Sequence, residues 1–267
     1  MPFTLRALSF GKIIKEAFAL YGEHFFLFLG ISAVPNLLLL MLQYGLGQIP
    51  AGRPLNPGMA TLLAGLGLPL ASLFASSIVT AATTVAVSDI YTDRLPDLWD
   101  SFARLSGKAF RVLVAAFLVE LFVGVGTIFF IIPGIYFAGI YGMAIPVVVL
   151  ENLGPKKALD RSEELTKDST GRVILVFFLT ATCTGLLVLA LNAAASLGWT
   201  ASDRGIVSKH VLNLVTTTVG GILFGPISAI ALALEYYDLR VRFEGFNLQQ
   251  LRTLVTTPEN LHSDVMS

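Results

Sequence analysis

Residues 131–167, IIPGIYFAGIYGMAIPVVVLENLGPKKALDRSEELTK, give the clearest indication of the fold. The first twenty of these residues carry no charge, whereas the segment after Glu151 is dense in Lys, Arg, Asp and Glu. An uncharged run of that length avoids water, and so charged a segment stays in water or on a membrane face. The stretch therefore predicts a membrane boundary at Glu151, with a tight turn at Pro133-Gly134 before the apolar helix and an amphipathic helix after Gly154-Pro155.

The composition of the whole chain agrees with a membrane protein. Hydrophobic residues make up 55% of the 267 residues and charged residues 13%, whereas about 25% of an ordinary globular domain is charged. The formal net charge is zero, so no basic footprint predicts nucleic acid as a partner. The only cysteine, Cys183, excludes an intrachain disulfide and a cysteine-based metal site. No cleavage site follows the basic N-terminus, so no removable signal peptide is predicted.

The hydropathy pattern predicts an all-α bundle with six membrane spans in one domain over residues 1–252. The spans are expected at about 25–44, 59–87, 109–132, 135–150, 173–197 and 211–234. Prolines are expected to interrupt four of these spans, and they are Pro35, Pro69, Pro146 and Pro226. The last helix should continue through EYYDLRVRFEG into water, and residues 253–267 should form a disordered cytoplasmic tail.

Three amphipathic helices are expected on the cytoplasmic face, beginning near Ser9, Ser101 and Pro155. Each precedes a pair of spans, which suggests a weak threefold repeat. Lys and Arg set the orientation: fifteen flank the spans on one side and three on the other. Both termini are therefore predicted to be cytoplasmic. A re-entrant hairpin of spans three and four would leave every charged loop on the same side, so that alternative stays open.

Glu120 is the only ionisable residue deep in a predicted span. An ionised carboxyl at that depth costs several kcal/mol, so Glu120 is a candidate for proton or cation coupling. The alternative is a protonated carboxyl that is hydrogen-bonded to Asn192, Asn213 or a threonine of the last span. The interrupted helices have two readings as well, because they either line a substrate site or simply aid packing.

The basic residues after Glu151 could hold anionic lipid headgroups, and the candidates are Lys156, Lys157 and Arg161. The alternative is topogenic charge on a solvated face. The histidines His24, His210 and His262 are far apart in the sequence, so no metal site, catalytic group or cofactor is predicted.

Several separated motifs resemble the membrane domain attached to some bacterial glycerophosphoryl diester phosphodiesterases. They are the PGIY turn at 133–136, the short span ending at Glu151, the Gly-Pro…Ala-Leu…Ser…Leu segment after it, and YYDLRVR at 236–242. In that family a separate soluble barrel with a His-Arg-Gly start and metal-binding carboxylates is catalytic. No His-Arg-Gly occurs here. The resemblance therefore implies a stand-alone membrane domain in the bacterial cytoplasmic membrane and no phosphodiesterase activity.

Two functions are expected from these observations. The first is a non-catalytic module that acts as a scaffold or lipid-associated partner of another membrane or soluble protein. The second is a small transporter or channel that uses Glu120 and the kinked spans. An intramembrane enzyme is a third hypothesis, but a lone carboxylate cannot supply both an acid and a base, or a nucleophile with its activator.

Overall fold

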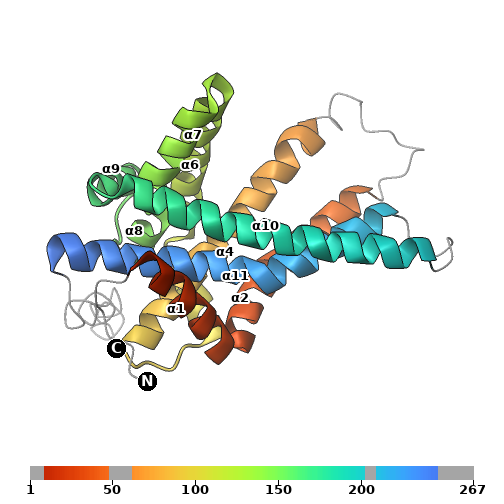
Figure 1. The fold of residues 1–267 in the computed structure, drawn as a ribbon, viewed down its shortest axis with the longest axis horizontal. Helices are drawn as coiled ribbons and strands as arrows, with labels where there is room; N and C mark the ends of the chain where they lie inside the picture. Colours follow the sequence, from red (N-terminus) through yellow and green to blue (C-terminus); the bar gives the residue numbers. More distant parts are fainter. Residues whose placement is uncertain (1–8, 48–61, 202–208, 246–267) are drawn as a thin grey trace, which may run out of the picture.

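The computed structural model describes residues 9–47, 62–201 and 209–245, and Figure 1 shows their arrangement. The predicted tail, 253–267, lies outside these residues. In chain order the helices are α1 (Phe10–Glu23), α2 (Phe25–Gly47), the π-helical turn η1 (Leu63–Gly67), α4 (Leu68–Tyr91), α5 (Leu98–Ser106), α6 (Ala109–Phe129), α7 (Ile131–Tyr141), α8 (Ala144–Glu151), α9 (Pro155–Thr166), α10 (Thr170–Ala201) and α11 (Lys209–Glu244). No strand occurs in this part of the chain.

Six stretches of the described chain are long and apolar enough to cross a membrane, which confirms the predicted number of spans. They are Phe25–Leu46, Gly65–Tyr91, Ala109–Phe129, Ile131–Glu151, Thr170–Leu197 and Val211–Glu244. The chain is therefore a multi-pass membrane protein. The second and last stretches extend further than predicted, because each continues into a charged segment, SDIY in α4 and EYYDLRVRFE in α11.

The C-terminal part of α11 differs from its prediction in environment. It stays helical, and Asp238 accepts a 2.7 Å hydrogen bond from Arg242 one turn later, as the i,i+4 spacing predicts. However, Tyr236, Tyr237 and Leu239 are buried and do not extend into water. Helices α1, α4 and α9 pack against α11 and cover this segment.

The turn between α6 and α7 lies three residues earlier than predicted. Phe130 alone leaves the helical conformation, with φ −159° and ψ 145°, and its N–H donates to the Gly126 carbonyl at 2.9 Å. Pro133 and Gly134 instead lie in the first turn of α7. Proline fits there because the first N–H groups of a helix have no intrahelical acceptor. Gly134 is needed for packing, because a Cβ at this position would lie within 3.0 Å of backbone atoms of Thr127 in α6.

The break in the fourth span also lies upstream of its predicted position. The chain leaves the helix between Tyr141 and Ala144, and Pro146 falls in the first turn of α8. Helix α9 satisfies the freed backbone groups: the Ser162 hydroxyl donates to the Ile140 carbonyl at 2.6 Å and accepts from the Met143 N–H at 3.1 Å. A broken helix at membrane depth is stable only where such partners cover it.

The other predicted kink prolines, Pro35, Pro69 and Pro226, take different positions in their helices. Pro35 and Pro226 lie inside α2 and α11. Pro69 lies in the first turn of α4, directly after the wide turn η1. Pro146 therefore begins a helix, where a missing N–H has no cost, whereas Pro69 follows a π-helical turn within a continuous helical run.

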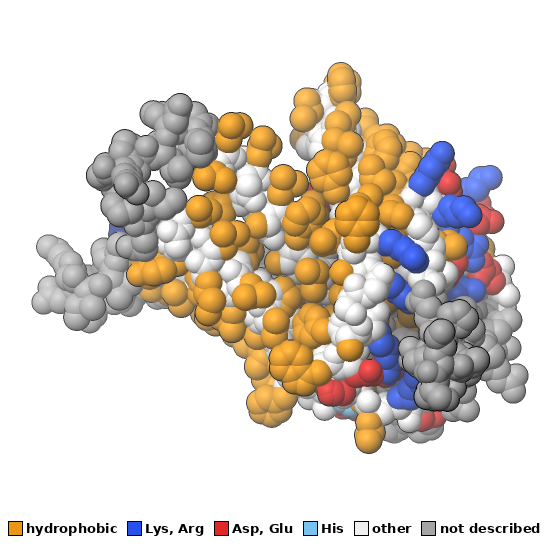
Figure 2. All heavy atoms as spheres, turned by 180° about the vertical axis from the view of Figure 1, so that it is seen from behind, with side chains coloured by type: hydrophobic (Ala, Val, Ile, Leu, Met, Phe, Trp, Pro, Cys, Tyr) orange, Lys and Arg blue, Asp and Glu red, His pale blue; other side chains and the backbone are white. Residues whose placement is uncertain are grey.

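The helices meet at one end of the molecule and diverge from it. In Figure 1 the α6–α7 hairpin, the first half of α4 and the far ends of α10 and α11 point in three directions away from the end that holds α9. Figure 2 shows that Lys, Arg, Asp and Glu gather at one end of the visible face, whereas hydrophobic side chains cover the diverging parts. The surface is hollowed between these parts (Figure 2).

The tip of the α6–α7 hairpin is apolar and exposed. Its five consecutive hydrophobic residues, 128–132, are each at least 69% exposed. The N–H and the carbonyl of Phe130 are both hydrogen-bonded, to Gly126 and Gly134, which reduces the number of polar groups that would face lipid.

Gly134→Ala tests the close approach of α6 and α7. A Cβ at this position would lie 2.9 Å from the Thr127 backbone nitrogen, so the two helices must separate. We expect a loss of about 1–3 kcal/mol of unfolding free energy, measured by denaturant titration in micelles. Gly124→Ala is the matched control, because a Cβ there meets nothing within 4 Å and alanine favours the helix. Equal stability of the two variants would contradict this packing.

Candidate functional site

Acidic side chains at the ends of three spans are the first candidate site. Asp89 lies near the end of α4, Glu151 is the last residue of α8, and Glu235 and Asp238 lie near the end of α11. The side chains of Asp89, Glu235 and Asp238 have 0–1% of their surface exposed. Buried carboxylates are stable only when they are paired and hydrogen-bonded.

An arginine from a neighbouring helix pairs with each buried carboxylate. Arg104 of α5 donates from Nη1 to Oδ1 of Asp89 at 2.8 Å and also pairs with Asp100 on its own helix. Arg172, in the first turn of α10, lies 3.1 Å from Glu235 and 2.7 Å from Asp238. These pairs attach α5 to α4, and α10 to α11.

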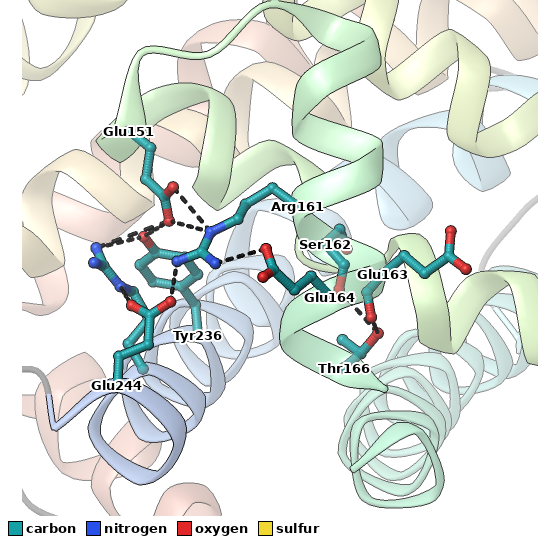
Figure 3. Close-up of polar contacts among 9 residues, drawn as sticks. Glu151, Arg161, Ser162, Glu163, Glu164, Thr166, Tyr236 and Glu244 are labelled. Carbon is teal, nitrogen blue, oxygen red and sulfur yellow. Dashed lines mark hydrogen bonds and ion pairs between the residues drawn. The ribbon is translucent and has the colours of Figure 1, made fainter. Parts of the chain in front are cut away.

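Glu151 belongs to a larger network around Arg161 of α9, which Figure 3 shows. Arg161 contacts Glu151 at 3.2 Å and Glu164 at 2.9 Å, and it also pairs with Glu244 of α11. The Tyr236 hydroxyl donates to Glu151 at 2.8 Å. The network therefore connects the broken span, the helix after it and the last helix.

The environment of Arg161 differs from the lipid-headgroup role predicted for it. Burial alone would lower the pKa of this guanidinium, but hydrogen bonds to Glu164 and Glu244 and the charge of Glu151 outweigh burial and raise the pKa above its ordinary value. Arg161 is thus a permanent cation whose partners are carboxylates of this chain. Lys156 and Lys157 are exposed, so they keep the predicted role.

Arg104→Ala tests the pair with Asp89. Removing the guanidinium leaves the fully buried carboxylate without its ion-pair partner, and we expect a loss of about 3–5 kcal/mol in a denaturant titration. Asp100→Asn removes the other ion pair of Arg104. Because the Asp100 side chain is 46% exposed, that variant should lose less than about 1 kcal/mol. Similar losses in both variants would refute the special role of Asp89.

Arg161→Met tests whether α9 is attached through its arginine. The variant retains an unbranched apolar stem but leaves three carboxylates without this donor, so we expect a loss of about 2–3 kcal/mol. Lys157→Met, on the exposed side of the same helix, should change stability by less than about 0.5 kcal/mol. If Lys157→Met were the more damaging variant, the Arg161 network would not hold α9.

The second candidate site is a cavity of about 630 Å³ between the diverging helices. Helices α2, α4, α6, α7, α8, α10 and α11 contribute to its wall, which is mainly apolar. Its polar side chains are Ser32, Asn36, Ser72, Ser76, Ser77, Thr80, Glu120, Tyr141, Thr180 and Ser228. A cavity of about 300–1,000 Å³ with a few polar groups is typical of a small-molecule site.

Glu120 is the charged residue of this cavity. It lies in the middle of α6, is exposed, and forms no hydrogen bond or ion pair with any residue that the structure describes. The protonated carboxyl bonded to Asn192 or Asn213 is therefore not what the structure shows. A carboxyl inside a membrane span without a protein partner indicates a functional site.

Asn192 and Asn213 lie elsewhere, between α10 and α11. The Asn192 amide donates to the Val188 carbonyl at 2.9 Å, and its oxygen accepts from the Thr216 hydroxyl. Asn213 contributes a backbone carbonyl, which accepts from Thr216 at 3.2 Å. Neither residue lines the cavity. Of the three predicted polar residues, Glu120 therefore belongs to the cavity, whereas Asn192 and Asn213 belong to the contact between α10 and α11.

Sequence reasoning missed Asn36 and the hydroxyl stripe of α4. Ser72, Ser76 and Thr80 recur every four residues, which places them on one face of the helix. That spacing was the available signal, but serine and threonine in a span also allow close helix packing. Among the described residues no group of three His, Cys, Asp or Glu side chains could hold a metal ion.

Comparisons of the chain with protein-family models, curated proteins and solved structures found no match.

Proposed function

We propose that this chain is a membrane transport protein whose solute occupies the cavity around Glu120. The observation that supports this function is the carboxyl of Glu120, which faces a cavity of about 630 Å³ in the middle of a span and has no partner among the described residues. A scaffold needs neither a cavity of this size nor an intramembrane carboxyl, both of which cost stability.

The broken fourth span adds to this proposal. The cavity wall includes Tyr141, Gly142 and Ile145, which flank the break between α7 and α8. Discontinuous helices line substrate sites in many transporters, because their free backbone groups and hinges are useful there. In this chain Ser162 and Thr166 of α9 cap the break from the charged end. A movement of α9 would therefore reach the cavity wall directly.

For orientation, we place the charged end in the cytoplasm, with both termini on that side. The fifteen-to-three distribution of Lys and Arg supports this choice. Helices α1, α5 and α9 would then lie at the cytoplasmic surface of the membrane. The exposed side chains of Phe18, Leu95 and Trp99 suit an interface that is apolar on one side and wet on the other.

The second candidate function is a non-catalytic, lipid-associated module that serves another protein. The exposed side chains of Lys156, Lys157 and Trp99 favour it, since basic and aromatic residues suit an anionic lipid surface. The resemblance to the membrane domain of bacterial glycerophosphoryl diester phosphodiesterases supports the same reading and a location in the bacterial cytoplasmic membrane. On either reading we propose no enzymatic activity of the chain itself.

Glu120→Gln tests the transport function. Purified protein is reconstituted in liposomes, and solute-induced currents or uptake are recorded for methylammonium, choline, glycine, acetate and glycerol 3-phosphate. We expect transport of at least one of these solutes by the unmodified protein. Glu120→Gln should transport it at least about tenfold more slowly, because a charged hydrogen bond is worth roughly 1.5–3 kcal/mol.

Ser196→Ala is the matched control for this assay. Ser196 is an exposed residue of α10 outside the cavity wall, so its substitution should leave transport unchanged. Fluxes no higher than those of protein-free liposomes for all five solutes would refute the proposal and favour the lipid-associated module. Transport that is identical in the Glu120→Gln variant would refute the role of the cavity.

A further inference from the structure

Most serine and threonine hydroxyls in the cavity wall already donate their protons to backbone carbonyls. Ser72 donates to the Pro69 carbonyl, Ser76 to the Leu73 carbonyl and Thr80 to the Ser76 carbonyl, at 2.8–2.9 Å. Ser77 and Thr180 donate to carbonyls one turn earlier in the same way. A hydroxyl has one proton and two lone pairs. These side chains therefore present acceptors to the cavity.

The donor groups of Asn36 and Ser32 are also used within the protein. The Asn36 amide nitrogen donates to the Ser32 carbonyl at 2.8 Å and to its hydroxyl oxygen at 3.3 Å. Ser32 in turn donates to the Gly221 carbonyl at 3.4 Å. The Asn36 carbonyl oxygen therefore remains as an acceptor. The hydroxyls of Ser228 and Thr184 share one hydrogen bond at 3.0 Å.

The charge of the cavity wall has one sign. Glu120 is acidic, and no Lys, Arg or His is among the described residues that line the cavity. The Tyr141 hydroxyl is the clearest remaining donor, and its ring can also contact a cation through its π face. The wall is thus rich in acceptors and poor in donors, with one negative charge and a mainly apolar remainder.

We infer that the cavity selects a ligand with a positively charged hydrogen-bond donor, such as the ammonium of an alkylamine or a guanidinium, on a small apolar body. This inference rests on the proposed function and names the class of its solute. The ammonium supplies the countercharge that the Glu120 carboxylate lacks in this chain, and its protons meet the hydroxyl and amide oxygens. The apolar body contacts residues such as Leu39, Val123 and Phe177.

An anionic ligand does not fit this wall. Its oxygens would face the carboxylate and the lone pairs of the hydroxyls, and a buried anion without donors loses its hydration without compensation. A neutral apolar ligand would supply neither a countercharge nor a hydrogen-bond donor for the Glu120 carboxylate. The cation is therefore the one charge type that satisfies both the carboxylate and the acceptors.

Cysteine labelling with reagents of opposite charge tests this inference. The chain's only cysteine is removed by Cys183→Ser, and Ser76→Cys then places a thiol in the cavity wall. The purified protein in micelles is treated with 2-aminoethyl or 2-sulfonatoethyl methanethiosulfonate, which deliver an ammonium or a sulfonate group. The rate ratio of the two reagents is measured by intact mass, so effects on the thiolate fraction cancel.

Ser106→Cys supplies the reference, since Ser106 is exposed at the end of α5 and outside the cavity wall. We expect the ammonium-to-sulfonate rate ratio of the Ser76→Cys variant to exceed that of the Ser106→Cys variant by about tenfold or more. Glu120→Gln should remove most of this preference. Because the ratio is first read with Glu120 intact, the test does not depend on the stability of that variant. Ser72→Cys repeats it at a second position one turn away.

The outcomes separate this inference from the function on which it rests. Labelling by both reagents at the reference ratio would refute cation selectivity, while the cavity itself would remain accessible to solutes. A preference for the sulfonate reagent would also overturn it. If neither reagent reached Ser76→Cys or Ser72→Cys although Ser106→Cys reacted, the cavity would be closed to water-borne solutes, and the proposed transport function would fail as well.

Discussion

The structure depends on the pairing of buried carboxylates with arginines at one end of the helix bundle. Asp89, Glu235 and Asp238 are withdrawn from water, so each needs a cation fixed at hydrogen-bond distance. Arg104 and Arg172 supply it, and Arg161 performs the same task for the less buried Glu151. The Arg172 pair joins the spans α10 and α11, and the other pairs attach α5 and α9 to the ends of spans. Such contacts matter because hydrophobic burial alone does not drive helices together in a bilayer.

The same constraint accounts for the divergence of the helices. Once the charged end is held by ion pairs, α9 caps the break between α7 and α8, because Ser162 bonds to both sides of it. Away from this end the described spans carry few polar contacts between helices, apart from pairs such as Asn192 with Thr216. The α6–α7 hairpin and the first half of α4 therefore lie apart (Figure 1). The cavity around Glu120 occupies the space between them.

Much of this architecture could be predicted from the sequence, because hydropathy over about 20 residues and proline chemistry are local signals. They located the six spans and the continuation of α11. They misplaced the Pro133-Gly134 turn and the break at Pro146, since proline also begins helices. The buried end of α11 was missed as well. Charge density suggested water there, whereas Arg172, which pairs with both Glu235 and Asp238, comes from α10, and only the tertiary fold brings it near.

The site was less predictable for a related reason. Glu120 could be singled out because a carboxyl in a span is costly wherever it lies. Its neighbours could not, since Asn36, Ser76 and Ser228 belong to three different helices, and each is a common residue in packed spans. What makes them a site is that all three line one cavity with Glu120. Asn36 and Ser76 donate within their own helices and keep acceptor oxygens, and Ser228 shares a hydrogen bond with the Thr184 hydroxyl. A protein wall that offers acceptors and one negative charge, but almost no donors, is incomplete without a donor from outside the chain.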